Sequence, residues 1–144
     1  MEQAVKRTPV NNADWGQKFL MNQGEVIEGA TRHLTLSGQV AFTDDPDGEM
    51  GIGMLAAPED LRGQLEAALA NVDALLSEAG MDRSNIVQVH LFTTDVDGLM
   101  ANYDVYAEWI RPAGVMPPQS LLGVQRLALP ELLVEVEVSA AAGG

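Results

Sequence analysis

The most constraining feature of this sequence is a strictly alternating run near its C-terminal end, residues 132–139. Leu132, Val134, Val136 and Val138 fall on one side of an extended chain, and Leu133, Glu135, Glu137 and Ser139 fall on the other. A period of two is typical of a strand with one buried face. The run therefore predicts a half-buried strand with two carboxylates on its less buried face. A second strand, residues 117–129, is expected before it, with a turn at Pro130.

Residues 58–79 predict a long helix, because their apolar residues recur at i, i+4, i+7 and i+8 and form one continuous stripe. Pro58 suits the first turn of this helix, and Gly80 provides its stop. A second helix is expected to begin at Asp97 and to end at Arg111 and Pro112.

Three further strands are expected, at residues 18–27 with a turn at Gly24, at 31–40 and at 85–94. The last is apolar almost throughout, which predicts an interior strand covered on both faces. Strands and helices then alternate so that right-handed crossovers place both helices on one face of a mixed sheet. The fold class is α+β, and covering the other face of the sheet favours self-association.

The composition suits one soluble domain, residues 1–144, with a polar arm at 1–14 and a tail of small residues at 140–144. The net charge is −13, with 8 Lys and Arg against 21 Asp and Glu. A nucleic-acid partner is not expected, because such binding needs a basic surface. Neither a secretory signal nor a membrane span is indicated, so the expected location is the cytoplasm.

No metal or cofactor is expected. Residues 44–49 resemble a calcium loop, but the twelfth position of a loop that starts at Asp44 or Asp45 is Leu55 or Ala56, not a glutamate. The two histidines, His33 and His90, stand alone in predicted strands, and residues 51–53 lack the strand and helix that a phosphate-binding glycine loop requires.

Motifs in order along the chain resemble those of the RidA/YjgF family. Pro118-Gln119-Ser120 stands where that family has Ala-Arg-Ser, and Val134-Glu135-Val136-Glu137 stands where it has Ile-Glu-Ile-Glu. The remaining matches are Ser37-Gly38-Gln39, Gln64 and Asn71 in the first helix, Ala79-Gly80 after it, and Asn102 with Tyr106 in the second helix. The resemblance covers residues 15–140.

The resemblance implies a chorismate-mutase-like fold: a mixed sheet of about five to six strands, two helices on one face, and a homotrimer with clefts between subunits. It implies hydrolysis of small 2-imino acids or enamines, with Glu135 positioning or activating water. Asn102, Ser37, Gly38 and Ser120 are implied cleft residues. For Gly38 the alternative is a bulge without a ligand. Trp15 aligns loosely with a cleft tyrosine of the family, and its alternative role is to anchor the N-terminal arm.

Gln119 departs from the family pattern, because the family has an arginine there that pairs with the substrate carboxylate. Glutamine carries no charge, so a carboxylate ligand would bind roughly ten- to a hundredfold more weakly. Lys18 and Arg32 are alternative cations, whereas Arg126 is at odd separation from Gln119 and is expected on the other strand face. The replacement favours a neutral amide, carbamoyl or carbonyl group on the substrate.

Three functions remain open at this stage. The first is a Rid-type hydrolase or deaminase acting on a small metabolite, and the second is a non-catalytic trimer that binds a small ligand. The third, a ribonuclease, is disfavoured by the acidic charge. Whether the chain is an enzyme depends on whether Glu135→Gln abolishes turnover while ligand binding persists.

Overall fold

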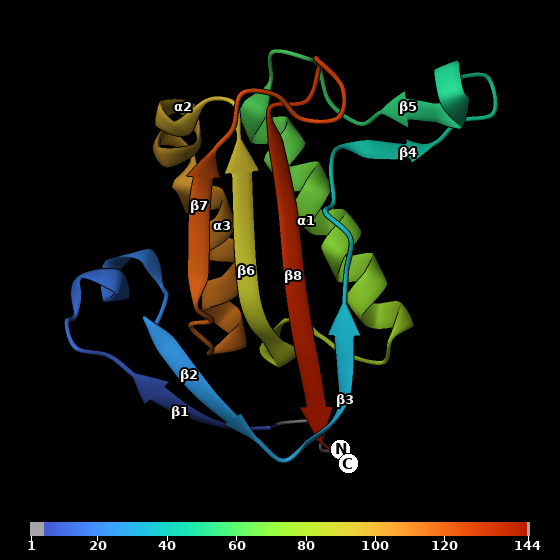
Figure 1. The fold of residues 1–144 in the computed structure, drawn as a ribbon. Coiled ribbons are helices and arrows are strands. Elements are labelled where there is room, and N and C mark those ends of the chain that lie inside the picture. The colour runs from blue at the N-terminus through green and yellow to red at the C-terminus, as the bar shows by residue number, and fades with distance from the viewer. Residues whose placement is uncertain (1–4, 144) are drawn as a thin grey trace.

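The computed structural model describes residues 5–143, and its centre is a four-stranded mixed sheet (Figure 1). In spatial order the strands are β3 (Ala30–Thr35), β8 (Val134–Gly143), β6 (Ile86–Thr93) and β7 (Gln119–Gly123). β8 runs antiparallel to β3 and β6, while β6 and β7 are parallel. The α+β class and the mixed sheet are confirmed. The central sheet has four strands, however, where five to six were expected.

The other four described strands form two separate hairpins. They are β1 (Lys6–Val10) with β2 (Gly24–Glu28), and β4 (Phe42–Asp44) with β5 (Ile52–Met54). Both hairpins project beyond the central sheet (Figure 1). Short 3-10 helices connect several elements: η1 (Trp15–Phe19), η2 (Glu49–Gly51), η3 (Arg83–Asn85) and η4 (Arg111–Ala113).

Three α-helices cover one face of the sheet, and in Figure 1 they lie behind it. They are α1 (Leu61–Glu78), α2 (Val96–Ala101) and α3 (Tyr103–Ile110). Asp60 caps α1 through the Gly63 N–H, so α1 starts three residues later than predicted. The predicted second helix is two helices broken at Asn102, and its cap is Asp95 rather than Asp97.

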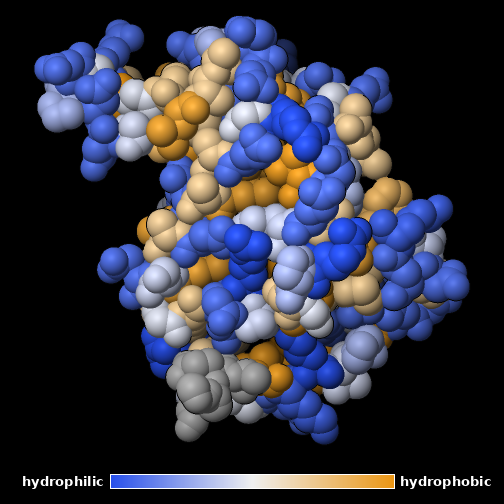
Figure 2. All heavy atoms as spheres, turned by 180° about the vertical axis from the view of Figure 1, so that it is seen from behind, coloured by the Kyte–Doolittle hydropathy of each residue, from blue (hydrophilic) through white to orange (hydrophobic). Residues whose placement is uncertain are grey.

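The hydrophobic core lies between this helix layer and the inward faces of β6 and β8. Val89, Leu91, Val134, Val136 and Val138 are buried in it from the sheet. The predicted alternation of β8 is therefore confirmed. Figure 2 shows the opposite, outer side of the helix layer as mostly hydrophilic, with apolar colour in the hollows between side chains and on the projecting hairpin.

Within one chain only one face of β6 is covered, so the expected covering of its second face stays a prediction. In β6 the buried residues alternate with partly exposed ones, among them His90 and Phe92, on the face without helices. This open face is mixed in character: Leu122 of β7 is 43% exposed, while Glu135 and Glu137 of β8 lie on the other side of β6.

The N-terminal region is more regular than the predicted arm. β1 pairs with β2, and residues 18–27 are not one strand, because η1 precedes β2. Arg7 holds this hairpin on the core: its guanidinium pairs with Glu25 at 2.8 Å and donates to the carbonyls of Ser84 and Ile86. Residues 1–4 of the predicted arm lie outside the described residues.

The small residues at the C-terminal end belong to the sheet instead of forming a tail. β8 continues to Gly143, and Ala140, Ala141 and Ala142 are buried against β3. Asn85 donates from its side chain to the Ala141 carbonyl. Small side chains suit this position because it is packed on both sides. Residue 144 lies outside the described residues.

No helix within residues 5–143 combines the length and the apolar character needed to cross a membrane.

Gln64 generates the first prediction, because it joins α1 to the segment before β8. The side chain is fully buried, accepts from the Leu133 N–H at 2.8 Å, and donates to the carbonyls of Ala57, Pro58 and Glu131. Gln64→Leu keeps the volume but leaves these groups without partners. We expect the free energy of unfolding, measured by urea titration, to fall by about 2–3 kcal/mol. The exposed change Glu66→Gln on the same helix should alter it by less than about 0.5 kcal/mol. Equal effects of the two would contradict this account.

Arg7 generates the second prediction. Its side chain is 14% exposed and that of Glu25 only 3%, so Arg7→Ala leaves a carboxylate buried and unpaired. Such a loss costs about 3–5 kcal/mol, which should speed hydrogen exchange of the β1 and β2 amides by at least about a hundredfold. Lys6→Ala is the matched control, because Lys6 is exposed and lies 3.8 Å from Glu28. Unchanged exchange in Arg7→Ala would show that the hairpin is held by other contacts.

Candidate functional site

Glu135 lies on the open face of β8, directly against Gly38. A side chain built on Gly38 would overlap the Glu135 carboxylate, so only glycine allows this approach. Ser37, the preceding residue, is exposed, and its carbonyl accepts from the Gln39 side chain at 3.1 Å. The structure therefore brings together three residues predicted from sequence: Ser37, Gly38 and Glu135.

A second carboxylate and a histidine lie beside Glu135 on the same face. The His90 Nδ1 is 2.9 Å from the Glu137 carboxylate, and Ser120 pairs with His90 from the neighbouring strand. Partial burial raises the pKa of Glu135, and the negative charge of Glu137 raises it further. A carboxyl with a raised pKa is a better proton acceptor when ionised, so this face can support general-base chemistry.

Gln119 lies on the other side of the sheet. It pairs with Val89, which is fully buried under the helices, so its side chain points toward the helix layer. Its Nε2 donates to the Tyr103 hydroxyl of α3 at 2.8 Å. The Tyr103 hydroxyl in turn lies 2.7 Å from the carbonyl of Phe19 in η1. Gln119 thus joins the sheet edge to α3 and η1.

Two tyrosines of α3 surround this contact. The Tyr103 and Tyr106 rings pack with centroids 5.5 Å apart, and the Phe19 ring meets Tyr103 edge-on at 5.8 Å. Burial raises the pKa of Tyr103 to about 12, so this hydroxyl stays protonated at neutral pH. The buried Tyr106 hydroxyl has no hydrogen-bond partner among residues 5–143. Burial raises the pKa of this hydroxyl, and the neighbouring Gln119 opposes the rise.

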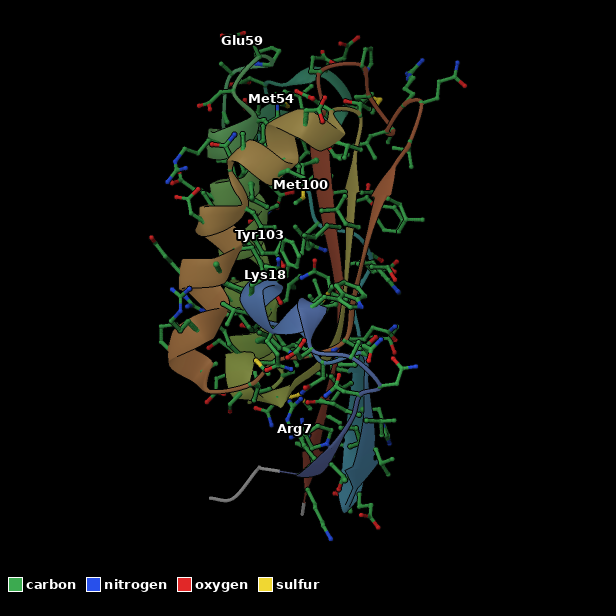
Figure 3. The ribbon with its side chains drawn as sticks, turned by 90° about the vertical axis from the view of Figure 1, so that its left-hand side faces the viewer. Arg7, Lys18, Met54, Glu59, Met100 and Tyr103 are labelled. Carbon is green, nitrogen blue, oxygen red and sulfur yellow. The ribbon has the colours of Figure 1, made fainter. Side chains whose placement is uncertain are left out.

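A pocket of about 230 Å³ opens beside Gln119 at the β7 edge. Its lining is uncharged and consists of Trp15, Gly16, Met21, Asn22, Gln23 and Gln119. Figure 3 shows η1, with Lys18 labelled, lying across this edge at the level of Tyr103. Trp15 is 52% exposed there. The structure therefore brings Trp15 and Gln119 together in one pocket wall, and the role of Trp15 in ligand binding stays a prediction.

The two alternative cations, Lys18 and Arg32, and Arg126 lie in different places. The Lys18 ammonium is 5.9 Å from the Phe19 ring centroid in η1. Arg32 donates to the Ala79 carbonyl beyond the end of α1. Arg126 was expected on the strand face opposite Gln119, but β7 ends at Gly123 and Arg126 lies in the following loop.

Asn102 belongs neither to the residues around Glu135 nor to the pocket at Gln119. It occupies the break between α2 and α3, where its side chain donates to the Gly98 carbonyl at 2.9 Å. It also accepts from Arg62 of α1 at 3.3 Å. These contacts tie the helix layer together, and its expected role in a cleft stays a prediction.

Sequence reasoning missed Tyr103 and the pair His90–Glu137. Tyr103 directly follows Asn102, which the motif match had identified, and this position was the available signal. The pairing of His90 with Glu137 depends on the register between β6 and β8, which a single sequence does not contain.

A larger pocket of about 340 Å³ lies between the β4–β5 hairpin and residues 129–131, and none of the site residues predicted from sequence lines it. Within residues 5–143, no three His, Asp or Glu side chains are clustered closely enough to hold a metal ion.

The comparison with known proteins identifies the family and the fold. The family model described as endoribonuclease L-PSP matches residues 22–142. A RutC family protein of Aquifex aeolicus is 32% identical over 107 residues, which cover 74% of this chain and 78% of that protein. A RutC family protein of Leuconostoc mesenteroides is 30% identical over 74% of this chain and 78% of its own length.

A solved structure shares the architecture. It is YyfB of Yersinia pestis, a protein of unknown function of the conserved Rid family, with 27% identity and a TM-score of 0.78 over 94% of this chain and 98% of that one. Sequence and fold therefore agree, and the chain belongs to the endoribonuclease L-PSP family, the RidA/YjgF family of small proteins.

Proposed function

We propose that this protein is a Rid-type small-molecule hydrolase whose active site forms between copies of the chain in a homotrimer. The observation that carries the proposal is the separation of Glu135 from Gln119. Gln119 pairs with Val89 on the helix side, whereas Glu135 pairs with Phe92 on the open side, three positions farther along β6. One chain therefore holds a base and a pocket that do not meet.

Association supplies what one chain lacks. The open face carries Phe92 and Leu122 among polar side chains, and a second copy would cover them. In the proposed trimer, Glu135 of one copy completes the pocket at Gln119 of another. The cytoplasm remains the proposed location.

The proposed reaction needs little from the protein, because an imine carbon is already electrophilic. Glu135 takes a proton from water while the water oxygen bonds to the imine carbon, and it passes this proton to the nitrogen. The carbon–nitrogen bond of the resulting carbinolamine then breaks as the hydroxyl proton moves to the nitrogen, which leaves as ammonia, and a carbonyl remains. Orientation and proton transfer are the two contributions required. The raised pKa of Glu135 favours its role as base.

A second candidate is a non-catalytic protein that binds a small ligand. It is favoured by the surroundings of Gln119: the amide is bonded to Tyr103, and the residues that line the pocket are uncharged. Such a pocket can bind a small ligand without Glu135. Ribonuclease activity is not proposed, because the net charge of −13 opposes RNA binding.

Glu135→Gln tests the base. Glutamine keeps the shape of the side chain but does not accept the proton, so we expect turnover to fall by about 10²–10⁴-fold. Ligand binding should stay within about twofold, which follows from the unchanged shape. In the parent protein the rate should fall as the pH drops through the raised pKa of Glu135, because the protonated carboxyl is not a base.

The matched control is Glu137→Gln on the same face of β8. It should lower turnover far less, since Glu137 is bonded to His90. Equal losses in the two variants, or full turnover in Glu135→Gln, would remove Glu135 from the mechanism.

Gln119→Arg tests the pocket. With 2-imino acids generated in situ by an amino-acid oxidase, we expect the parent protein to be slow and the variant to gain about ten- to a hundredfold. Gln125→Arg adds the same charge at an exposed loop position and should gain nothing. A parent protein that already consumes imino acids rapidly would mean that another cation binds the carboxylate. Inactivity of both proteins would favour the binding protein.

A further inference from the structure

We infer that the pocket at Gln119 takes a ligand whose anchoring group is a neutral carboxamide or carbamoyl N–H donor, and that it discriminates against the corresponding carboxylate. This inference rests on the proposed function, because it concerns the same pocket, and it goes further by giving the chemistry of the group bound there.

The first step is the direction of the hydrogen bonds at Tyr103. A phenol hydroxyl has one proton. The Tyr103 oxygen lies 2.7 Å from the Phe19 carbonyl and 2.8 Å from the Gln119 Nε2, whereas the Gln119 Oε1 is 3.1 Å away. A carbonyl only accepts, so the proton of Tyr103 goes to Phe19. Gln119 must then donate to Tyr103.

The second step concerns the donors and acceptors of the Gln119 amide that its bond to Tyr103 does not use. Its amide nitrogen is anchored toward α3, so the amide cannot turn freely to suit any ligand. An amide oxygen has two lone pairs, and even a bond from the neighbouring Tyr106 hydroxyl would occupy only one of them. Gln119 therefore keeps one N–H donor and one acceptor lone pair. A ligand carboxamide, which has both a carbonyl oxygen and N–H groups, matches this pair, whereas a carboxylate matches only the donor and leaves the amide oxygen without a partner.

The third step is the absence of charge in the pocket wall. All six lining residues are uncharged. Asn22 is 5% exposed and is already bonded to Asn11 and to Glu25, a carboxylate that lies behind the wall. The whole chain carries a charge of −13, which repels anions further. An anionic group would lose water there and gain no counter-charge.

Trp15 suits the same class of ligand. Its indole is half exposed at the mouth of the pocket, and a flat amide can lie against an aromatic face. The inferred reactant is then an imine or enamine that carries a carboxamide where the usual substrate carries a carboxylate. Hydrolysis would release ammonia and leave a 2-oxo amide.

The probes are 2-oxobutanamide and 2-oxobutanoate, which differ in one group. In ¹⁵N-labelled protein the indole N–H of Trp15 reports on the pocket. That of Trp109, which is buried and bonded to Asp73, is the internal reference for the fold. We expect the amide to shift the Trp15 signal with at least about tenfold higher affinity than the carboxylate. Equal or tighter binding of the carboxylate, or no shift by either probe at tens of millimolar, would overturn the inference.

Three variants test which side chains set the preference for the amide over the carboxylate. Gln119→Arg should reverse the preference. Tyr103→Phe releases the amide and should reduce the preference several-fold while the Trp109 signal stays in place; an unchanged preference would refute the role of Tyr103. Lys18→Gln should leave the preference intact, and its loss would mean that Lys18 governs the ligand.

The inferred ligand class and the proposed hydrolase activity can each be contradicted without the other. Amide binding without turnover of any imine would retain the inference and remove the hydrolase. Rapid turnover of 2-imino acids together with tight binding of 2-oxobutanoate would retain the hydrolase and overturn the inference.

Discussion

The structure depends on the alternation of β8, which lies between β3 and β6 at the centre of the sheet. Its valines at 134, 136 and 138 are buried against the helix layer, and the burial of each such side chain contributes about 1.5–3 kcal/mol. The same alternation forces Glu135 and Glu137 onto the open face. The buried valines and the position of the candidate base are therefore consequences of one pattern. A shift of the β8 register by one residue would move both to the wrong face of the sheet.

A second constraint acts at the edge of the sheet. Tyr103 has a single proton, and its oxygen contacts two partners, the Phe19 carbonyl and the Gln119 amide. These contacts join η1, α3 and β7. Gln119 therefore contributes more than a neutral group in the pocket, because its amide is part of how the pocket wall is held in place.

Much of the fold could be predicted from sequence, and the successes share a cause. β8 and α1 carry long periodic apolar patterns, so local sequence and tertiary burial agree. The break at Asn102 was missed, because an apolar helical spacing continues across it. Residues 140–143 were read as a tail, since alanine and glycine give no periodic signal even where they are buried against β3.

The candidate site was predictable only in part. The motif matches identified Glu135, Gly38 and Gln119, but the faces on which they lie depend on strand register, which comes from pairing across the sheet. The sequence alone therefore suggested one group of residues, whereas the fold divides them between the open face and the β7 edge. Tyr103 escaped notice because its hydrogen bonds are all to residues far away in the chain.

The central claim is that Glu135 of one copy meets the pocket of another. The chain has no cysteine, so the double variant Gln23→Cys with Glu135→Cys places thiols only at the pocket rim and at the base. Treatment with a short bis-maleimide, followed by denaturing electrophoresis, should give covalent dimers and trimers, while each single variant mixed with the parent protein stays monomeric. A double variant that remains a single chain on the gel would contradict the account.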